Sequence, residues 1–148
     1  MLQWTRGWGV ERCVERRLPE VYMDGTNREL IERYLDCYNE KSVDRMLDLF
    51  AEDVVFESVS NTTGVIRTTG KEELRRLARR SVEYFEQRRQ APVSWVIDDT
   101  HVAVEIDYWC RLAQDLPDGH KAGAEMRLRG ASFFTIQDGR IAKLVDYV

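Results

Sequence analysis

Two tyrosines, Tyr34 and Tyr38, lie four residues apart among apolar residues that recur at helical spacing. Residues four apart share one face of a helix, which places both phenols on the same side as Leu30 and Leu35. Aromatic residues with this spacing usually belong to the core. A buried tyrosine hydroxyl still needs a hydrogen-bond partner, and in a pocket it can donate to a bound carbonyl or oxyanion. Both tyrosines are therefore candidates for contact with a ligand.

Asp146 is the second candidate because it stands in an otherwise apolar segment, next to Leu144, Val145, Tyr147 and Val148. Successive side chains of a strand point to opposite faces, so Leu144, Asp146 and Val148 share one face. If that face is turned inward, the carboxylate lies in an apolar cavity, where desolvation raises its pKa and suits it to acid–base catalysis. If the face is turned outward, Asp146 is solvated. The alternation alone leaves both arrangements open.

Other catalytic and cofactor motifs are absent from the sequence. It contains no GxxxxGK[ST], GxGxxG or GxSxG pattern. Its few histidines and cysteines lack the spacing of metal ligands: His101, His120, Cys13, Cys37 and Cys110. We therefore expect neither a metal nor another cofactor. The odd number of scattered cysteines and the lack of an apolar leader predict a cytoplasmic protein.

The composition restricts the partners of this protein. Of 148 residues, 43% are hydrophobic and 32% charged, as is typical of a globular domain. The net charge of −4 provides no positive field for nucleic acid or for a membrane surface, so we expect neither as a partner. Six arginines between residues 75 and 89 suggest an anion site, but glutamates three and four residues away favour a solvated helix face with local ion pairs. These arginines are Arg75, Arg76, Arg79, Arg80, Arg88 and Arg89.

Helices are predicted in the first part of the chain. Thr26 and Glu29 have capping-box spacing, which predicts that a helix begins at Thr26 and continues to residue 39. Ser42 is expected to cap a second helix that extends to Phe50, and a third helix is predicted from residue 71 to about residue 89. A short strand over 54–58 and a loop or irregular edge over 60–70 separate the last two helices.

Strands are predicted in the second part, over 93–97, 101–112, 125–136 and 140–148. The alternation is clearest over 101–112, and Asp138-Gly139 predicts a tight hairpin between the last two strands. Helices followed by antiparallel strands predict an α+β fold with the helices on one face of the sheet. Residues 1–26 are expected to be an N-terminal extension, of the kind that is often disordered, and residues 27–148 the folded domain.

Two segments, 32–39 and 43–56, resemble the opening of proteins of the nuclear transport factor 2-like superfamily, in particular its SnoaL-like polyketide cyclase and ketosteroid isomerase group. The segment 133–141 is similar to a hairpin of this group, in which Asp-Gly-Lys/Arg-Ile follows a hydrophobic strand. The resemblance covers about residues 27–148. It implies a cone-shaped, cystatin-like α+β barrel: three helices packed in a curved, mostly antiparallel sheet with an internal pocket.

The resemblance also implies roles for particular residues. Tyr34 stands where the isomerases have the tyrosine of their oxyanion hole. Their general base falls on Ser58 and their second oxyanion acid on or near Ser132, and serine cannot abstract a carbon-bound proton without an activating base, which disfavours steroid isomerisation. The same alignment turns Asp146 into the pocket. The remaining wall residues that it implies are Tyr38, Phe50, Tyr108, Leu128, Gly130, Phe134, Leu144 and Val148.

We therefore expect a small hydrophobic ligand in an internal cavity. If the protein is an enzyme, the resemblance favours a cofactor-independent isomerase, cyclase, dehydratase or hydrolase. Asp146 would exchange the proton, Tyr34 would stabilise the oxyanion, and Ser58 and Ser132 would orient substrate or water. The alternative is a non-catalytic ligand-binding or assembly module. In both cases we expect a homodimer that pairs through the outer face of the sheet. The residues expected on that face are Glu105, Trp109, Arg111, Arg127 and Arg129.

Overall fold

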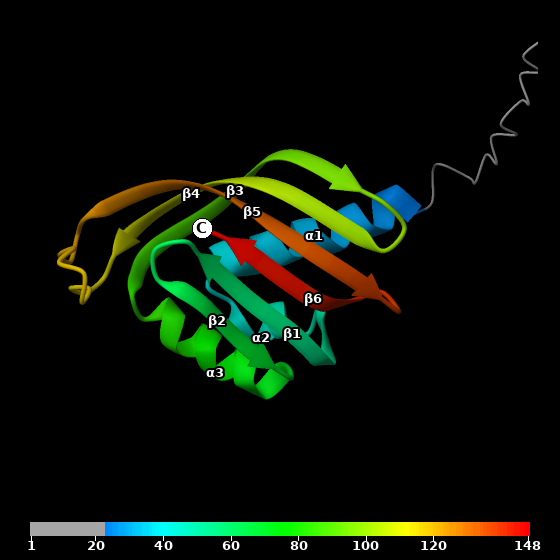
Figure 1. The fold of residues 1–148 in the computed structure, drawn as a ribbon, viewed down its shortest axis with the longest axis horizontal. Coiled ribbons are helices and arrows are strands. Elements are labelled where there is room, and N and C mark those ends of the chain that lie inside the picture. The colour runs from blue at the N-terminus through cyan, green and yellow to red at the C-terminus, as the bar shows by residue number, and fades with distance from the viewer. Residues whose placement is uncertain (1–22) are drawn as a thin grey trace, which may run out of the picture.

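A computed structural model describes residues 23–148, which form three helices and six strands (Figure 1). The helices are α1 (Met23–Asn39), α2 (Val43–Leu47) and α3 (Lys71–Val82). The strands are β1 (Phe50–Ser60), β2 (Gly64–Thr69), β3 (Phe85–Ile97), β4 (His101–Leu112), β5 (Glu125–Gln137) and β6 (Arg140–Tyr147). Of the predicted extension, residues 1–22 lie outside the described part of the chain, whereas residues 23–26 form the start of α1.

The six strands form one mixed sheet in the order β2-β1-β6-β5-β4-β3. All neighbours are antiparallel except β1 and β6, which run parallel. In Figure 1, β3, β4 and β5 curve over α1, and α3 packs against β1 and β2. The α+β class and the three helices are confirmed. Within residues 23–148 the sheet is open, with β2 and β3 as its edges, so the cone is completed by helices rather than by strand closure.

The core lies between the sheet and α1. The alternation of apolar residues along β4 contributes to this core. Val102, Val104 and Ile106 are almost fully buried and alternate with more exposed residues. From α1, a stripe of apolar residues packs onto them: Leu30, Ile31, Tyr34 and Leu35. The predicted hairpin between β5 and β6 is also confirmed. Asp138 and Gly139 both have positive φ angles, 51° and 72°, as this type of tight turn requires.

The predicted helix boundaries are partly wrong. Among the described residues α1 covers Met23–Asn39, so Thr26 lies inside it and does not cap it. Helix α2 ends at Leu47, and Phe50 begins β1. Helix α3 ends at Val82, seven residues earlier than predicted.

Strand pairing explains the early end of α3. Residues from Phe85 onward pair with β4, with Arg88 opposite Cys110 and Gln90 opposite Tyr108. A run of charged and polar residues with good helix propensity therefore forms a strand, because tertiary pairing overrides local propensity. The segment predicted as a loop or irregular edge contains β2, which is an edge strand paired with β1.

Candidate active site

The concave face of the sheet and the three helices enclose a cavity of about 340 Å³. Its wall is mainly apolar and aromatic, with a few polar groups, as in many small-molecule sites. Of the residues predicted for the site, these line it: Tyr34, Tyr38, Phe50, Ser58, Tyr108, Leu128, Gly130, Ser132, Leu144, Asp146 and Val148. Phe134 does not line this cavity. It lies behind the wall, with its ring in edge contact with Tyr34 at 5.3 Å between centroids.

Three polar side chains come together through the register of the sheet. In the parallel pair, Ser58 of β1 lies opposite Asp146 of β6, and in the antiparallel pair Ser132 of β5 lies opposite the same Asp146. All three residues belong to the face of the sheet that lines the cavity. The parallel pairing of β1 with β6 is thus what places residues from distant parts of the chain in one row.

Asp146, in the middle of this row, has one hydrogen-bonding side chain as its partner. Ser132 Oγ donates to Asp146 Oδ1 at 2.6 Å. Burial raises the pKa of Asp146 from 3.8 to about 6, and the hydrogen bond from Ser132 acts in the opposite direction. No ion pair within residues 23–148 involves Asp146. The carboxyl group is therefore desolvated and free of a structural counterion, which suits it to exchange a proton near neutral pH.

Tyr34 supplies a phenol to the same cavity from the middle of α1. Its ring is held between Phe50 and Phe134 by edge contacts and is only 2% exposed. Burial raises its pKa well above the usual value, and the negative charge of Asp146 raises it further. The hydroxyl consequently stays protonated at neutral pH and remains a hydrogen-bond donor.

The sequence analysis missed two polar residues of the wall, Arg88 and Gln90. Arg88 was assigned to a solvated helix face, but it lies in β3, is 5% exposed and lines the cavity. Its guanidinium carbon lies 3.7 Å from the ring centroid of Tyr38, and its Nε donates to the backbone carbonyl of Tyr38 at 3.1 Å. Gln90, two residues along the strand, is also buried. The sequence did contain a signal for this arrangement. Arg88 and Gln90 are two residues apart, as side chains on one face of a strand are, and they lie just before Pro92, which marks an extended segment.

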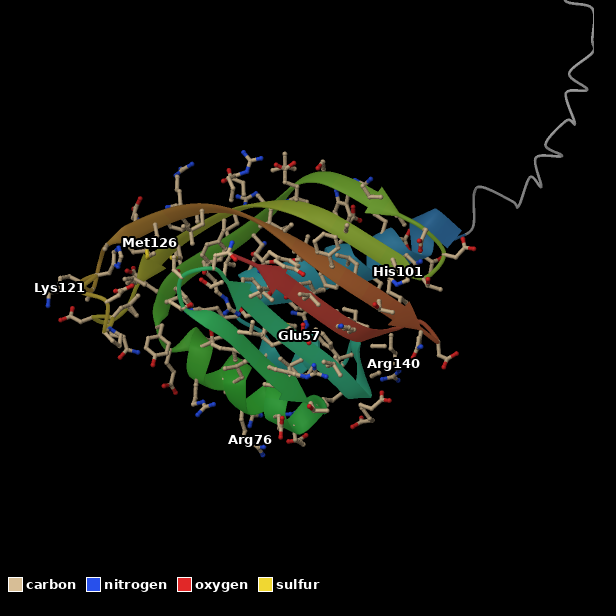
Figure 2. The ribbon with its side chains drawn as sticks, in the orientation of Figure 1. Glu57, Arg76, His101, Lys121, Met126 and Arg140 are labelled. Atoms are coloured by element: carbon tan, nitrogen blue, oxygen red, sulfur yellow. The ribbon has the colours of Figure 1, made fainter. Side chains whose placement is uncertain are left out.

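The other arginines of that cluster are more exposed than Arg88, as predicted, although Arg89 lies in β3 and not on a helix. Arg75 and Arg79 pair with Asp44 of α2, and Arg75 also pairs with Glu72 three residues earlier. Arg76 is exposed on the side of α3 that is turned away from the sheet (Figure 2). Only Arg88 was predicted to be solvated but is buried. Helix α3 ends at Val82, so Arg88 lies in β3 and not on the solvated face of that helix.

The end of α1 holds β3 in position. Asn39 Nδ2 donates to Gln90 O at 3.1 Å, and Gln90 N donates to Asn39 Oδ1 at 2.7 Å. Lys41 Nζ donates to the carbonyls of Phe85 and Glu86. An edge strand has unpaired backbone groups on one side, and here side chains at the end of α1 satisfy several of them. This connection fixes Tyr38 of α1 against Arg88 of β3.

A close backbone contact shapes the other end of the cavity. A Cβ atom on Gly130 of β5 would lie 2.6 Å from the backbone oxygen of Tyr147, which is closer than such atoms approach. Only glycine therefore allows the end of β6 to lie where it does, directly after Asp146.

Four of the five residues predicted for a dimer contact on the outer face, Glu105, Trp109, Arg111 and Arg129, are paired within the chain. Arg129 pairs with Glu105, and Arg111 with Glu125, which also accepts a hydrogen bond from Trp109. Nearby, Phe133 and Tyr147 form an exposed edge-to-face pair on the same face. The homodimer stays a prediction.

Neither a cluster of metal ligands nor a membrane-spanning helix is found in the part of the chain that the structure describes. Residues 23–148 contain no group of three or more side chains placed to hold a metal ion. In the same part of the chain, no helix has the length and apolar character needed to cross a membrane. The expected lack of a cofactor and the cytoplasmic location stay predictions.

Fold and cavity together define an α+β cone with an internal site, and comparison with known proteins agrees with this class. Residues 31–144 match the family described as SnoaL-like domain, and the chain belongs to that family. No curated protein matches the chain.

Several solved structures share the fold. A phenazine biosynthesis-related protein from Pseudomonas aeruginosa has a TM-score of 0.71 at 21% identity, over 84% of this chain and 80% of that one. An LEH-like epoxide hydrolase from M. tuberculosis has a TM-score of 0.67 at 18% identity, over 83% and 82%. A protein with a ketosteroid isomerase-like fold from Catenulispora acidiphila also has a TM-score of 0.67 at 18% identity, over 81% and 85%. Likeness at this level of identity establishes the fold, which hosts several chemistries.

Proposed function

We propose that this protein binds a small, largely apolar molecule in the cavity and catalyses a proton transfer on it without a cofactor. The observation that carries the proposal is Asp146, a cavity carboxyl group whose pKa burial raises to about 6 and which has no cationic partner among the described residues. Perturbed acids of this kind in a pocket are characteristic of general acid–base catalysis.

The reaction uses two groups of the wall in sequence. The ionised carboxylate of Asp146 takes a proton from a carbon next to a carbonyl group of the ligand, and the electron pair of that C–H bond moves to the carbonyl oxygen. The hydroxyl of Tyr34 donates a hydrogen bond to the resulting oxyanion. Protonated Asp146 then returns the proton: to a different carbon in an isomerisation, to the oxygen of a second carbonyl group that the carbanion attacks in a cyclisation, or to the hydroxyl group that leaves as water in a dehydration.

The position of Ser132 supports this assignment. Its hydrogen bond fixes one oxygen of the Asp146 carboxyl group, which leaves the other oxygen for the ligand. Ser58 lies on the opposite side of Asp146 in the same row and lines the cavity, where it can orient substrate or water. The names of two structural relatives, an epoxide hydrolase and a phenazine biosynthesis-related protein, support chemistry on small cyclic molecules in such a cone.

The proposal is tested with 5-nitrobenzisoxazole, a small apolar probe whose isoxazole ring opens by cleavage of its N–O bond when a base removes the C–H proton of that ring. We expect kcat/KM to rise with pH around an apparent pKa near 6, as the carboxyl group of Asp146 ionises. Asp146→Asn should lower kcat/KM about 100-fold or more, the usual contribution of a general base. Asp107→Asn is the matched control, because Asp107 lies on β4 between the inward-facing Ile106 and Tyr108 and points away from the cavity.

The result that contradicts the proposal is a wild-type rate no higher than that of D146N. In that case the alternative of a ligand-binding protein without catalysis is favoured.

A further inference from the structure

We propose that the molecule bound in this cavity carries a carboxylate group, which the guanidinium of Arg88 binds at the end of the cavity formed by α1, β3 and β4. The inference rests on the proposed function in that it concerns the same cavity and names the class of its ligand.

The first observation is that Arg88 is a buried cation without a counterion. It is 5% exposed and lines the cavity. Within residues 23–148, the arginines that have a carboxylate oxygen within 4.0 Å are Arg28, Arg45, Arg67, Arg75, Arg79, Arg111 and Arg129. All of these are far more exposed than Arg88. The arginine that most needs a negative partner is thus one that has none in the described part of the chain.

The second observation concerns the hydrogen bonds of the guanidinium, which has five N–H donors. Only Nε is used, in its bond to the Tyr38 carbonyl. The two terminal nitrogens have no hydrogen-bond partner among the described residues. The rings of Tyr38 and Phe85, at 3.7 Å and 5.9 Å, attract the cation through their faces. Such contacts compensate the charge only partly and leave the donors at the edge of the guanidinium available.

The third observation is an unpaired polar atom on the same wall. Gln90 Oε1 is buried and accepts no hydrogen bond within the described residues. Gln90 lies two residues from Arg88 on β3 and lines the same cavity. It can accept a hydrogen bond from a hydroxyl or N–H group next to the carboxylate of the ligand. Gln90 Oε1 and the terminal nitrogens of Arg88 therefore lack partners among the described residues, and the ligand would supply them.

The surrounding groups are suited to an anion and do not provide one. Tyr34, Tyr38 and Tyr108 lie close enough for the charge of Arg88 to lower their pKa values, and burial of each phenol acts more strongly in the opposite direction. All three hydroxyls stay protonated and are donors. Asp146 is not the missing partner, because its carboxyl oxygens do not lie within 4.0 Å of the Arg88 guanidinium. A ligand can therefore contact both the Arg88 guanidinium and the Asp146 carboxyl group without displacing an existing ion pair.

A carboxylate fits this end better than a larger anion. Its two oxygens match the two parallel N–H donors at the edge of a guanidinium, and its single charge neutralises Arg88 one to one. A phosphate dianion would leave excess negative charge in a cavity that also holds Asp146. The volume of about 340 Å³ admits a molecule of one or two rings. The expected ligand is a small, largely apolar monocarboxylic acid whose reactive carbon lies at the Asp146 end.

The experiment compares 2-naphthoate with 2-naphthamide, which have the same ring system and differ in charge. Calorimetric titration at pH 7.5 should show naphthoate binding about 10- to 100-fold more tightly to the wild-type protein, the range of a charged hydrogen bond. Arg88→Met keeps an apolar side chain of similar length and should abolish this preference. Arg89→Met is the matched control, since Arg89 is the next residue on β3 and is exposed, and it should keep the preference.

Arg88→Lys addresses the case in which Arg88→Met does not fold. It keeps the positive charge but loses the two parallel donors, so naphthoate affinity should fall about 3- to 10-fold while naphthamide affinity is unchanged. Equal affinities of the two probes for the wild type overturn the inference, as does a preference that is unchanged in R88M or R88K.

The outcomes separate this inference from the proposed function. If naphthamide binds as tightly as naphthoate, the carboxylate inference fails and the apolar binding cavity stands. If the naphthoate preference depends on Arg88 but ring opening of the benzisoxazole does not depend on Asp146, catalysis fails and the carboxylate site stands. If neither naphthalene probe binds, the carboxylate inference fails, and the dependence of benzisoxazole ring opening on Asp146 decides the proposed function separately.

Discussion

The two charged residues of the cavity, Asp146 and Arg88, are both buried but respond to burial in different ways. Asp146 can take up a proton, and its pKa rises to about 6 as a result. Arginine side chains stay protonated in proteins, so only contacts can compensate the charge of Arg88. The acid end of the cavity is therefore suited to proton exchange, and the basic end to binding an anion.

The two ends also differ in how the chain builds them. Asp146 lies on β6, between β1 and β5 in the interior of the sheet. Arg88 lies on β3, an edge strand whose free side is held by Asn39 and Lys41 at the end of α1. Interior strands fix a side chain through backbone pairing on both sides, whereas an edge strand needs side-chain contacts to do so. Catalytic geometry is thus expected to depend on the sheet and ligand binding on the junction of α1 with β3.

The largest expected effect is on stability, and it tests whether only the acid end responds to pH. The pKa of Asp146 is higher in the folded protein than its ordinary value of 3.8, so its contribution to stability is present below pH 3.8 and lost as the pH rises through about 6. Asp146→Asn should therefore stabilise the protein by about 3 kcal/mol at pH 8 and have no such effect near pH 3.5, at 1.36 kcal/mol per pKa unit. Urea unfolding at both pH values measures this difference.

Arg88→Met provides the contrast. Its effect on stability should be the same at both pH values, because the guanidinium is charged throughout. If the stabilisation by D146N does not change with pH, the inferred difference in pH response between the Asp146 end and the Arg88 end is contradicted.

A smaller effect is expected from Gly130→Ala, which should disturb only the acid end. The added Cβ would lie 2.6 Å from the backbone oxygen of Tyr147, so the end of β6 has to move. We expect a destabilisation of about 2 kcal/mol, as in other overpacked sites. The rate of benzisoxazole ring opening should fall, while the preference for naphthoate at the Arg88 end persists. Ala131→Ser, which adds one atom at the next residue, is the control and should be neutral in urea unfolding.

The smallest effect concerns the single hydrogen bond to Asp146. Since the bond from Ser132 Oγ lowers the pKa of Asp146, Ser132→Ala should raise that pKa further, by about one unit for a hydrogen bond to a charged group. The inflection of the pH–rate profile should move upward accordingly. Ser58→Ala is the matched control, because Ser58 occupies the equivalent position on the other side of Asp146 and makes no hydrogen bond to it. An equal shift in both variants would contradict the assigned role of Ser132.

The outcome of the sequence analysis differs between segments for a physical reason. Where the local pattern and the fold agree, the prediction is confirmed, as in the alternation of β4 and the Asp138-Gly139 turn. Where a segment has good helix propensity but pairs with a distant strand, the prediction is wrong, as for Arg88 and its neighbours in β3. Propensity acts within a few residues, whereas the pairing of Arg88 depends on Cys110, which is 22 residues away in the sequence.

The sequence by itself determined the α+β class, the family resemblance and the presence of an acid in an apolar strand. The alternation left open which way Asp146 faces, because it specifies that Leu144, Asp146 and Val148 share a face but not which face is buried; the inward arrangement was implied by the family resemblance alone. The tertiary structure decided this through the parallel pairing of β6 with β1, which turns that face toward the helices. It also decided that Arg88 is buried, because the contact between β3 and the end of α1 exists only in the folded chain.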